Sequence, residues 1–189
     1  MAYINLASLR LCTESEGPGK RMAIWVQGCN RRCLGCCNPE MQIIKQNVVV
    51  DTKDIIELIK KAKEIYKIEG ISLIGGEPIL QARGLFEVAK AAKSEKLTVL
   101  VFTGYQYEEL VTMKDKSVKQ LLEYIDILVD GSFQLDLYDE KRDWVGSSNQ
   151  NVLFLTNAYS PGVEYAKHEH QMEVLVSEND ILINGWPYV

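Results

Sequence analysis

The chain has 189 residues, 47% of them hydrophobic and 25% charged, with a formal net charge of −5. This composition is typical of a globular protein with a sizeable core and argues against a disordered or collagen-like chain. The sequence contains no block rich in lysine and arginine, no run of about 18 apolar residues and no basic-then-apolar leader. We therefore expect one cytoplasmic domain over residues 1–189, with neither nucleic acid nor a membrane as a partner.

Two strands are predicted near the start of the chain, at residues 4–11 and 22–27. A segment dense in turn-forming residues, 13–20, separates them. The second strand is almost continuously apolar, which is typical of a strand buried on both faces. It leads directly into Gly28 and a loop rich in cysteine. Because α/β folds place their sites at the carboxyl ends of strands, this loop is the first candidate site.

Four of the five cysteines lie within nine residues of this loop. Cys29, Cys33 and Cys36 have the spacing Cys-x3-Cys-x2-Cys, Cys37 follows immediately, and Cys12 lies upstream. So tight a group cannot join distant segments through disulfides, and it indicates a metal site in a reducing compartment. Thiolates favour iron–sulfur clusters, zinc or Cu(I). Three thiolates on a 4Fe–4S cluster would leave one iron without a protein ligand.

Two other ligand sets remain open from the residues alone. A zinc site would need a fourth thiolate, which Cys37 or Cys12 could supply. An electron-transfer cluster would also use four cysteines, with Cys12 as the fourth. Neighbouring residues of an extended chain point in opposite directions, so we expect Cys37 to line the site without binding the metal.

After the cysteine loop, helical and extended patterns alternate. Helices are predicted from the capping residues 51–54 onward and at 79–93, 107–113 and 117–124. Strands are predicted at 70–74, 97–102, 125–129 and 151–155, and a closing hairpin at 171–176 and 180–184. This alternation predicts an α/β fold of mainly parallel strands with helical crossovers.

The segment Gly75-Gly76-Glu77-Pro78 follows the strand at 70–74. It can be interpreted as a strand-to-helix turn, with flexible glycines, an acid near a helix N-terminus and proline in the first turn. That interpretation explains Pro78 better than it explains two consecutive glycines and an acid. The alternative is a backbone that approaches a ligand closely, with the Glu77 carboxylate binding a ligand ammonium group.

The Cys-x3-Cys-x2-Cys loop after one strand and Gly-Gly-Glu-Pro after the next together resemble the radical S-adenosylmethionine superfamily. The resemblance implies that Cys29, Cys33 and Cys36 bind a 4Fe–4S cluster. It also implies that the open iron is chelated by the amino and carboxylate groups of S-adenosylmethionine. Gly75, Gly76 and Glu77 would bind the methionine amino group.

Further segments carry a narrower resemblance: Trp25-Val26-Gln27-Gly28-Cys29, Asn38-Pro39-Glu40, Gly75-Gly76-Glu77-Pro78 with Gln81, Thr103-Gly104-Tyr105, and Asp126-Ile127-Leu128-Val129-Asp130-Gly131. These segments are similar to the anaerobic ribonucleotide reductase activating proteins, over about residues 20–155. At this length we expect an incomplete (β/α) barrel of mainly parallel strands, with a C-terminal strand extension in residues 156–189.

The implied activity is reductive cleavage of S-adenosylmethionine to a 5′-deoxyadenosyl radical, which takes a hydrogen atom from a glycine of a large partner protein. An electron donor such as flavodoxin or ferredoxin would reduce the cluster. Two other hypotheses stay open. The same cofactors could modify a small molecule, nucleotide or peptide, or the chain could be a zinc-binding interaction module.

The adenine contact departs from the common superfamily pattern. Gly35 stands where many members have an aromatic residue, and Cys37 stands where the activating proteins commonly have one. We therefore expect the backbone around Gly35, Cys36 and Cys37 to contact the adenine.

Several lesser candidates lie elsewhere in the sequence. Thr103 ends a predicted strand and is expected to line the pocket. Asp130 also ends a strand, where it either contacts S-adenosylmethionine or closes a turn. His168 and His170 could form a metal pair, although a solvated segment is the simpler interpretation.

Overall fold

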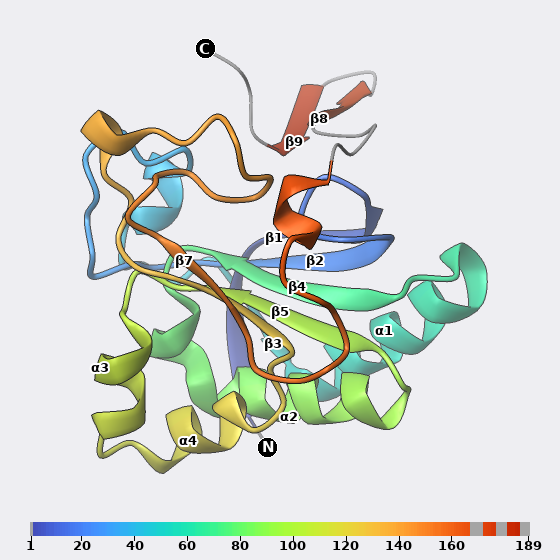
Figure 1. Ribbon diagram of the computed structural model, residues 1–189. Coiled ribbons are helices and arrows are strands. Elements are labelled where there is room, and N and C mark those ends of the chain that lie inside the picture. Colours follow the sequence, from blue (N-terminus) through green and yellow to red (C-terminus); the bar gives the residue numbers. More distant parts are fainter. Residues whose placement is uncertain (1, 167–171, 177–180, 186–189) are drawn as a thin grey trace.

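The computed structural model describes residues 2–166, 172–176 and 181–185 (Figure 1). Its centre is a seven-stranded sheet with the order β3-β1-β2-β4-β5-β6-β7. The strands are β1 (Tyr3–Thr13), β2 (Arg21–Val26), β3 (Val48–Asp51), β4 (Gly70–Gly75), β5 (Thr98–Phe102), β6 (Ile127–Asp130) and β7 (Asn151–Phe154). His168 and His170 lie outside the described residues.

The four central strands β2, β4, β5 and β6 run parallel, whereas β1, β3 and β7 pair antiparallel at the two sides. The prediction of an α/β fold with a mostly parallel sheet is therefore confirmed. Strands β1 and β2 are antiparallel because a turn joins them directly. Strand β3 is a difference from the sequence analysis, which assigned no strand between the cysteine loop and residue 51.

Four α-helices lie on one face of the sheet (Figure 1). They are α1 (Thr52–Tyr66), α2 (Ala82–Ser94), α3 (Tyr107–Thr112) and α4 (Lys116–Leu122). The predicted helix at 79–93 is in fact a 3₁₀ turn, η2 (Pro78–Gln81), followed by α2. The Glu77 side chain caps η2 by accepting from the N–H of Ile79, and Pro78 occupies its first turn, so the chain turns tightly before α2 begins.

The alternation of side chains along the strands separates a core face from a second face. Met22, Ile24 and Val26 of β2 belong to the apolar core that α1 and α2 cover. Trp25 of β2 and Ile74 of β4, which are register partners, point to the opposite face. That opposite face is where the cysteine loop, the loop between β6 and β7 and the C-terminal segment lie (Figure 1).

The C-terminal segment contains a hairpin of β8 (Met172–Val176) and β9 (Ile181–Gly185). Its strands agree with the predicted closing hairpin. It is attached to the turn after β1, because the N–H of Glu14 donates to Glu173 at 2.7 Å and the N–H of Gly185 donates to Glu16 at 2.9 Å.

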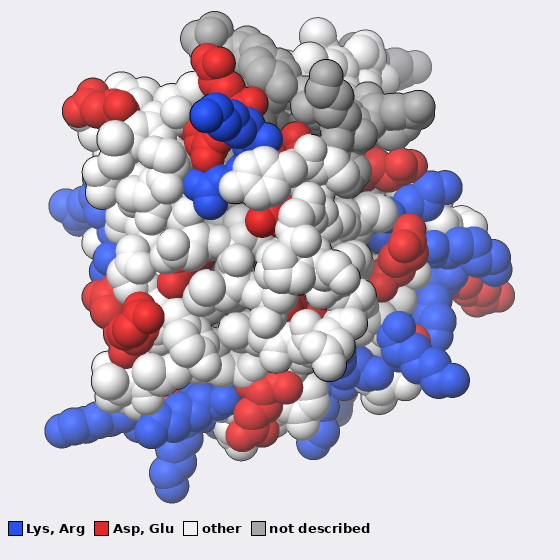
Figure 2. All heavy atoms as spheres, viewed as in Figure 1, with Lys and Arg blue, Asp and Glu red and all other residues white. Residues whose placement is uncertain are grey.

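Charged side chains are distributed unevenly over the surface. In Figure 2 lysines and arginines gather along the helical side of the molecule, and the middle of the face shown is largely uncharged. None of the helices within the described ranges is both long enough and apolar enough to cross a membrane.

Candidate active site

One large cavity, of about 990 Å³, lies against the sheet face that the helices leave free. Trp25, Ile74 and Phe102 form its floor from three parallel strands. Nearly all of the residues predicted for the site line it: Cys29, Cys33, Gly35, Cys36, Cys37, Gly75, Gly76, Glu77 and Thr103. Two motifs that are far apart in the sequence therefore share one cavity.

The cysteine loop is closed by hydrogen bonds to the segment that returns from it. The N–H of Gly28 donates to the carbonyl of Met41 at 2.8 Å, and the N–H of Cys29 donates to that of Gln42 at 3.2 Å. The Gln42 side chain donates in turn to the carbonyl of Cys33 at 3.3 Å. The 3₁₀ turn η1 (Pro39–Gln42) thus supports the loop from behind.

All five cysteines are free thiols. The backbone N–H of Arg31 lies 3.3 Å from Cys29 Sγ, and that of Asn38 lies 3.4 Å from Cys36 Sγ. Such N–H to sulfur bonds are among the contacts by which proteins tune iron–sulfur clusters. Burial raises the pKa of Cys29. These thiols have the donor chemistry and the hydrogen-bonded surroundings that a cluster needs.

Cys37 is placed differently from the other three. Its thiol is exposed and donates to the sulfur of Cys36, and its own sulfur accepts from Asn38 Nδ2 at 3.3 Å. This bond from Cys37, aided by the N–H of Asn38 and the Gln42 side chain, lowers the pKa of Cys36 to about 6. That Cys37 does not bind the metal stays a prediction.

Within residues 2–166, 172–176 and 181–185, no group of three or more His, Cys, Asp or Glu side chains is placed to hold a single metal ion. In a 4Fe–4S cluster each thiolate binds a different iron, so the ligands of a cluster need not converge on one point.

The two consecutive glycines bring the end of β4 against the cysteine loop. Gly75 has a φ of +107°, and a Cβ there would lie 2.6 Å from the backbone N of Val26. A Cβ on Gly76 would overlap the carbonyl of Gly28. The N–H of Gly76 donates to Val26 and the N–H of Glu77 donates to Gly28, both at 2.8 Å. Close approach of backbone to backbone explains both glycines.

Glu77 is 1% exposed, and its carboxylate is held by three donors. Thr103 Oγ1 and the N–H of Ile79 donate to Oε1 at 2.8 and 3.0 Å, and the N–H of Gly104 donates to Oε2 at 2.8 Å. Burial raises the pKa of Glu77, while these donors and the charge of Arg31 act in the opposite direction. A carboxylate accepts about four hydrogen bonds, so these three donors leave one acceptor position of Glu77.

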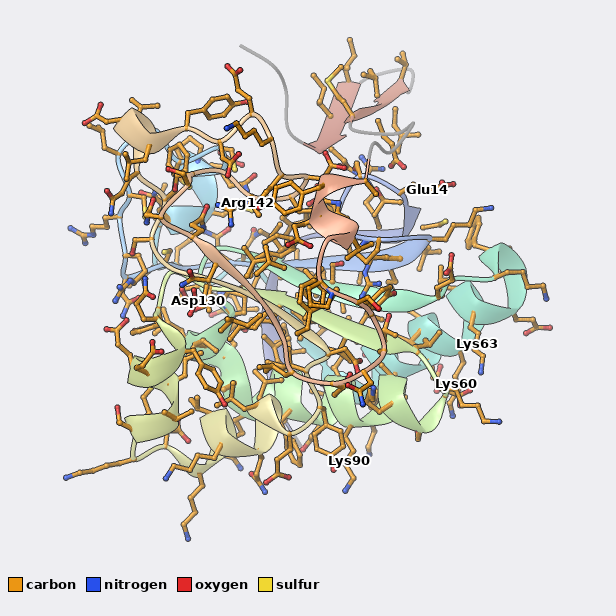
Figure 3. All side chains as sticks on the ribbon, in the orientation of Figure 1. Glu14, Lys60, Lys63, Lys90, Asp130 and Arg142 are labelled. Atoms are coloured by element: carbon orange, nitrogen blue, oxygen red, sulfur yellow. The ribbon has the colours of Figure 1, made fainter. Side chains whose placement is uncertain are left out.

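Asp130 does not join this group of residues. Its carboxylate is 1% exposed and accepts from the N–H of Tyr107 at 2.7 Å and from Asn151 Nδ2 at 2.8 Å. It fastens α3 and β7 to the end of β6 (Figure 3) and is not among the residues that line the cavity. A contact between Asp130 and S-adenosylmethionine stays a prediction.

Some of the residues that line the cavity belong to none of the sequence motifs. Arg31 lines it from within the cysteine loop, Arg142 and Trp144 come from the loop after β6 (Figure 3), and residues 183–185 come from β9. Arg142 is fixed by Asp139 at 2.7 Å. These residues belong to no spaced motif, and tertiary folding alone brings them to the cavity.

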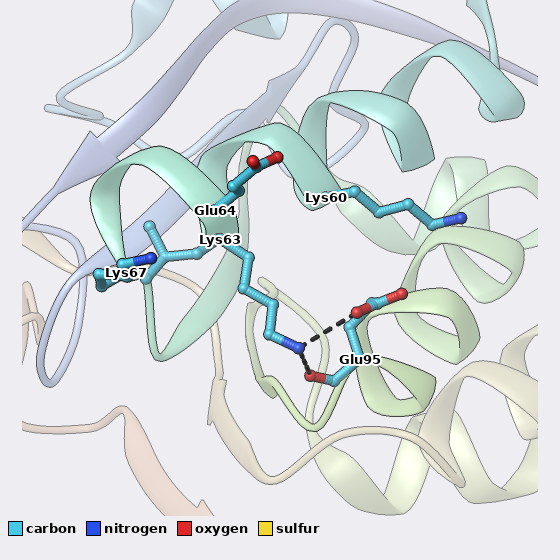
Figure 4. A pocket seen from close by; sticks show the side chains of 6 residues that line it. Lys60, Lys63, Glu64, Lys67 and Glu95 are labelled. Atoms are coloured by element: carbon cyan, nitrogen blue, oxygen red, sulfur yellow. Dashed lines mark hydrogen bonds and ion pairs between the residues drawn. The ribbon is translucent and has the colours of Figure 1, made fainter.

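A second hollow, of about 490 Å³, lies between α1 and Glu95 at the end of α2 (Figure 4). It is lined mainly by charged side chains, among them Lys60, Lys63 and Glu95. Lys63 donates to the carboxylate and to the backbone carbonyl of Glu95, at 3.1 and 2.6 Å. The hollow contains no thiol and lies apart from the cysteine loop, so it is not a second candidate site.

Comparison with known proteins places this chain in a family. Residues 15–153 match the model of a family described as a 4Fe-4S single cluster domain. The anaerobic ribonucleoside-triphosphate reductase-activating protein of Haemophilus influenzae is 33% identical over 72% of this chain and 89% of its own length. Its Escherichia coli K12 counterpart is 32% identical over 74% and 92%. QueE from Escherichia coli aligns structurally over 71% of this chain and 72% of its own, with a TM-score of 0.45 and 12% identity. The chain belongs to the 4Fe-4S single cluster domain family and to the family of anaerobic ribonucleoside-triphosphate reductase-activating proteins.

Proposed function

We propose that this protein is a radical S-adenosylmethionine enzyme that installs a glycyl radical in an anaerobic ribonucleoside-triphosphate reductase. The proposal rests on the backbone hydrogen bond from the N–H of Glu77 to the carbonyl of Gly28. This bond brings the loop that carries Cys29, Cys33 and Cys36 to the same cavity as a buried carboxylate with one free acceptor position. Family membership supports the reductase as the target.

In this proposal Cys29, Cys33 and Cys36 hold three irons of a 4Fe–4S cluster. When bound, the reduced cluster and S-adenosylmethionine supply a 5′-deoxyadenosyl radical, which takes a hydrogen atom from a glycine Cα of the partner. Glu77 accepts from the methionine ammonium group and so orients the sulfonium toward the cluster. Backbone around Gly35 contacts the adenine, and the apolar floor of the cavity excludes water.

The fold suits a polypeptide substrate. Four parallel strands have helices on one face and the cavity on the other, and we infer an incomplete (β/α) barrel whose unclosed side admits a loop of the partner. The hydrogen bonds between the β1 turn and the C-terminal hairpin support a single domain, with a core at about 20–155 and an extension at 156–189. An external one-electron donor such as flavodoxin or ferredoxin would reduce the cluster.

Anaerobic reconstitution with iron and sulfide tests the cofactor chemistry. The reduced wild-type protein should convert S-adenosylmethionine to methionine and 5′-deoxyadenosine, and Cys33→Ala should not. Cys12→Ala is the matched control, because Cys12 lies on β1 outside the cavity lining and its loss should leave the conversion intact. Equal conversion by wild type and Cys33→Ala would reject the cluster assignment.

The target requires a second measurement. Incubation with an anaerobic ribonucleoside-triphosphate reductase should give the doublet of a glycyl radical in the EPR spectrum.

One observation favours a different substrate, because residues 183–185 of the C-terminal hairpin line the cavity and lie beyond the matched family region. S-adenosylmethionine cleavage without a glycyl radical would support a small molecule, nucleotide or peptide instead. Stoichiometric zinc without iron would reject both enzymatic proposals.

A further inference from the structure

Arg31 lies between the first two cysteines and spans from their loop to the ends of two strands. Its guanidinium lies 4.4 Å from the centre of the Tyr105 ring, just after β5. Its Nε donates to Ser132 Oγ, just after β6, at 3.2 Å. Its Nη2 lies 3.7 Å from a carboxylate oxygen of Glu109 in α3. One side chain therefore connects the cysteine loop to the segment after β5, the segment after β6 and helix α3.

The partners of Arg31 are themselves fixed. Ser132 Oγ donates to the carbonyl of Gly104 at 2.9 Å while it accepts from Arg31, which uses its single proton and one lone pair. Glu109 accepts from the N–H of Gln106 at 2.7 Å, and the Tyr105 hydroxyl accepts from Asn30 at 2.6 Å. Two of the three partners of Arg31 are thus held by backbone groups, and the third, Tyr105, is held by Asn30 of the cysteine loop itself.

Gly104 provides the space that Arg31 needs. A Cβ on Gly104 would lie 2.7 Å from Arg31 Cγ. The N–H of the same glycine donates to the Glu77 carboxylate. The stem of Arg31 therefore packs on the backbone that holds Glu77, so the cysteine loop and the carboxylate share one support.

We propose that Arg31 is a positioning residue that locks the cysteine loop onto the ends of β5 and β6 and fixes the distance between the cluster and Glu77. The inference rests on the proposed function and deepens it. Two consequences follow. The guanidinium is permanently charged, so it favours the reduced, more negative state of a nearby cluster. Its fixed geometry also keeps the site ready for S-adenosylmethionine, so that less ordering is needed on binding.

Two substitutions separate the charge of Arg31 from its geometry. Arg31→Gln removes both, whereas Arg31→Lys keeps the charge but loses the planar group that stacks on Tyr105. Arg32→Gln is the matched control, because Arg32 is the exposed neighbour in the same loop. The reconstituted proteins are compared by the reduction potential of the cluster and by the Kd for S-adenosylmethionine.

Arg31→Gln should make the reduction potential more negative and raise the Kd about tenfold, which corresponds to one contact of moderate strength. Arg31→Lys should keep the potential near that of wild type and still raise the Kd. Arg32→Gln should change neither quantity. If Arg31→Gln behaves as Arg32→Gln does in both measurements, the proposal is wrong.

A further pair of variants covers the case in which Arg31→Gln does not retain its cluster. Ser132→Ala and Tyr105→Leu leave the sequence of the cysteine loop unchanged and remove partners of Arg31. Tyr105→Leu also removes the hydrogen bond from Asn30, and Tyr105→Phe, which loses only that bond, is its control. Ser132→Ala and Tyr105→Leu should each raise the Kd for S-adenosylmethionine, and wild-type values in both would overturn the proposal. If wild type itself holds a cluster but does not bind S-adenosylmethionine, the proposed function fails, and the reduction potentials still decide the role of Arg31.

Discussion

The backbone N–H of Glu77 donates to the carbonyl oxygen of Gly28 at 2.8 Å, one residue before the first cysteine of the loop. This bond continues the parallel pairing of β2 and β4, in which Val26 is opposite Gly75. The strand register therefore sets the position of the carboxylate relative to the thiols. Any change that separates these two backbones should impair the site even where every thiol and the carboxylate are retained.

Gly76→Ala tests this dependence. A Cβ at residue 76 would overlap the carbonyl of Gly28 and lie 2.9 Å from that of Met41, and backbone atoms cannot move aside cheaply. We expect the apoprotein to lose more than about 2 kcal/mol of unfolding free energy in urea. The reconstituted variant should also lose S-adenosylmethionine cleavage.

Gly162→Ala is the control for the loss of a glycine. Gly162 has a φ of +105° and open space around its Cβ position, so only backbone strain of about 1 kcal/mol is expected there. Gly76→Ala with wild-type stability and activity would contradict the backbone account.

Glu77→Gln tests the carboxylate without changing its size. The glutamine amide has one oxygen and one NH₂ group, so it cannot accept all three hydrogen bonds that the carboxylate accepts. Its NH₂ group would face either the N–H of Gly104 or the donors at Oε1. Loss of a charged hydrogen bond should raise the Kd for S-adenosylmethionine roughly 10- to 100-fold. Equilibrium binding to the reconstituted protein measures this, with iron content as the check that the cluster is intact.

The pH dependence of binding gives a second test of Glu77. Burial raises its pKa, so its carboxyl group ionises at a higher pH than an exposed glutamate does. Because the ionised form accepts from an ammonium group, wild-type affinity should rise as the pH rises through that pKa. The profile of Glu77→Gln should lack this rise, and parallel profiles would show that Glu77 does not bind the ligand.

The parallel core and both motifs could be predicted from the sequence, because each depends on local patterns. The apolar strand at 22–27 and the helical periodicity after residue 51 are properties of short segments. The three thiols and the Gly-Gly-Glu segment are recognised by the spacing of their residues in the sequence. The contact of the two glycines with Val26 and Gly28 could not be predicted, because it depends on the pairing of β2 with β4. Binding of S-adenosylmethionine by Gly75 and Gly76 stays a prediction.

Other features depend on contacts between distant segments and could not be predicted. Arg21 would be expected at the surface, yet it is fully buried and donates to Ser72 at 2.8 Å and to Tyr159 at 3.2 Å. Arg31 is an ordinary residue of a polar loop until β5 and β6 place Tyr105 and Ser132 beside it. No local sequence pattern predicts either arrangement.

Cys37→Ser tests whether the adjacent fourth cysteine is a ligand. Cys37 is exposed and donates to Cys36, and a serine hydroxyl can make the same bond. We expect Cys37→Ser to bind as much iron and sulfide as wild type and to cleave S-adenosylmethionine at a rate within about threefold of wild type. Cys33→Ala, treated identically, should lose the cluster. Loss of iron in Cys37→Ser would make Cys37 a ligand and would reopen the four-thiolate alternatives.

Glu16 gives the stability of the protein a specific pH dependence. It is 8% exposed, lines the cavity and accepts from the N–H of Gly185, and burial, with Glu173 nearby, raises its pKa from 4.5 to about 7. A carboxyl group whose pKa is higher in the folded state binds more protons there. Its contribution to the unfolding free energy is therefore complete below about pH 4.5 and is lost as the pH rises through about 7.

Glu16→Gln removes this titration and keeps an oxygen that can accept from Gly185. The difference in unfolding free energy between Glu16→Gln and wild-type apoprotein should therefore grow in favour of the variant between pH 4.5 and 7, by up to about 3 kcal/mol. Urea unfolding across this range measures it. Glu57→Gln, at an exposed position of α1, is the control for replacing a glutamate by glutamine. A constant difference for Glu16→Gln would mean that Glu16 does not titrate in this range, and that the attachment of the C-terminal hairpin to the β1 turn is independent of pH.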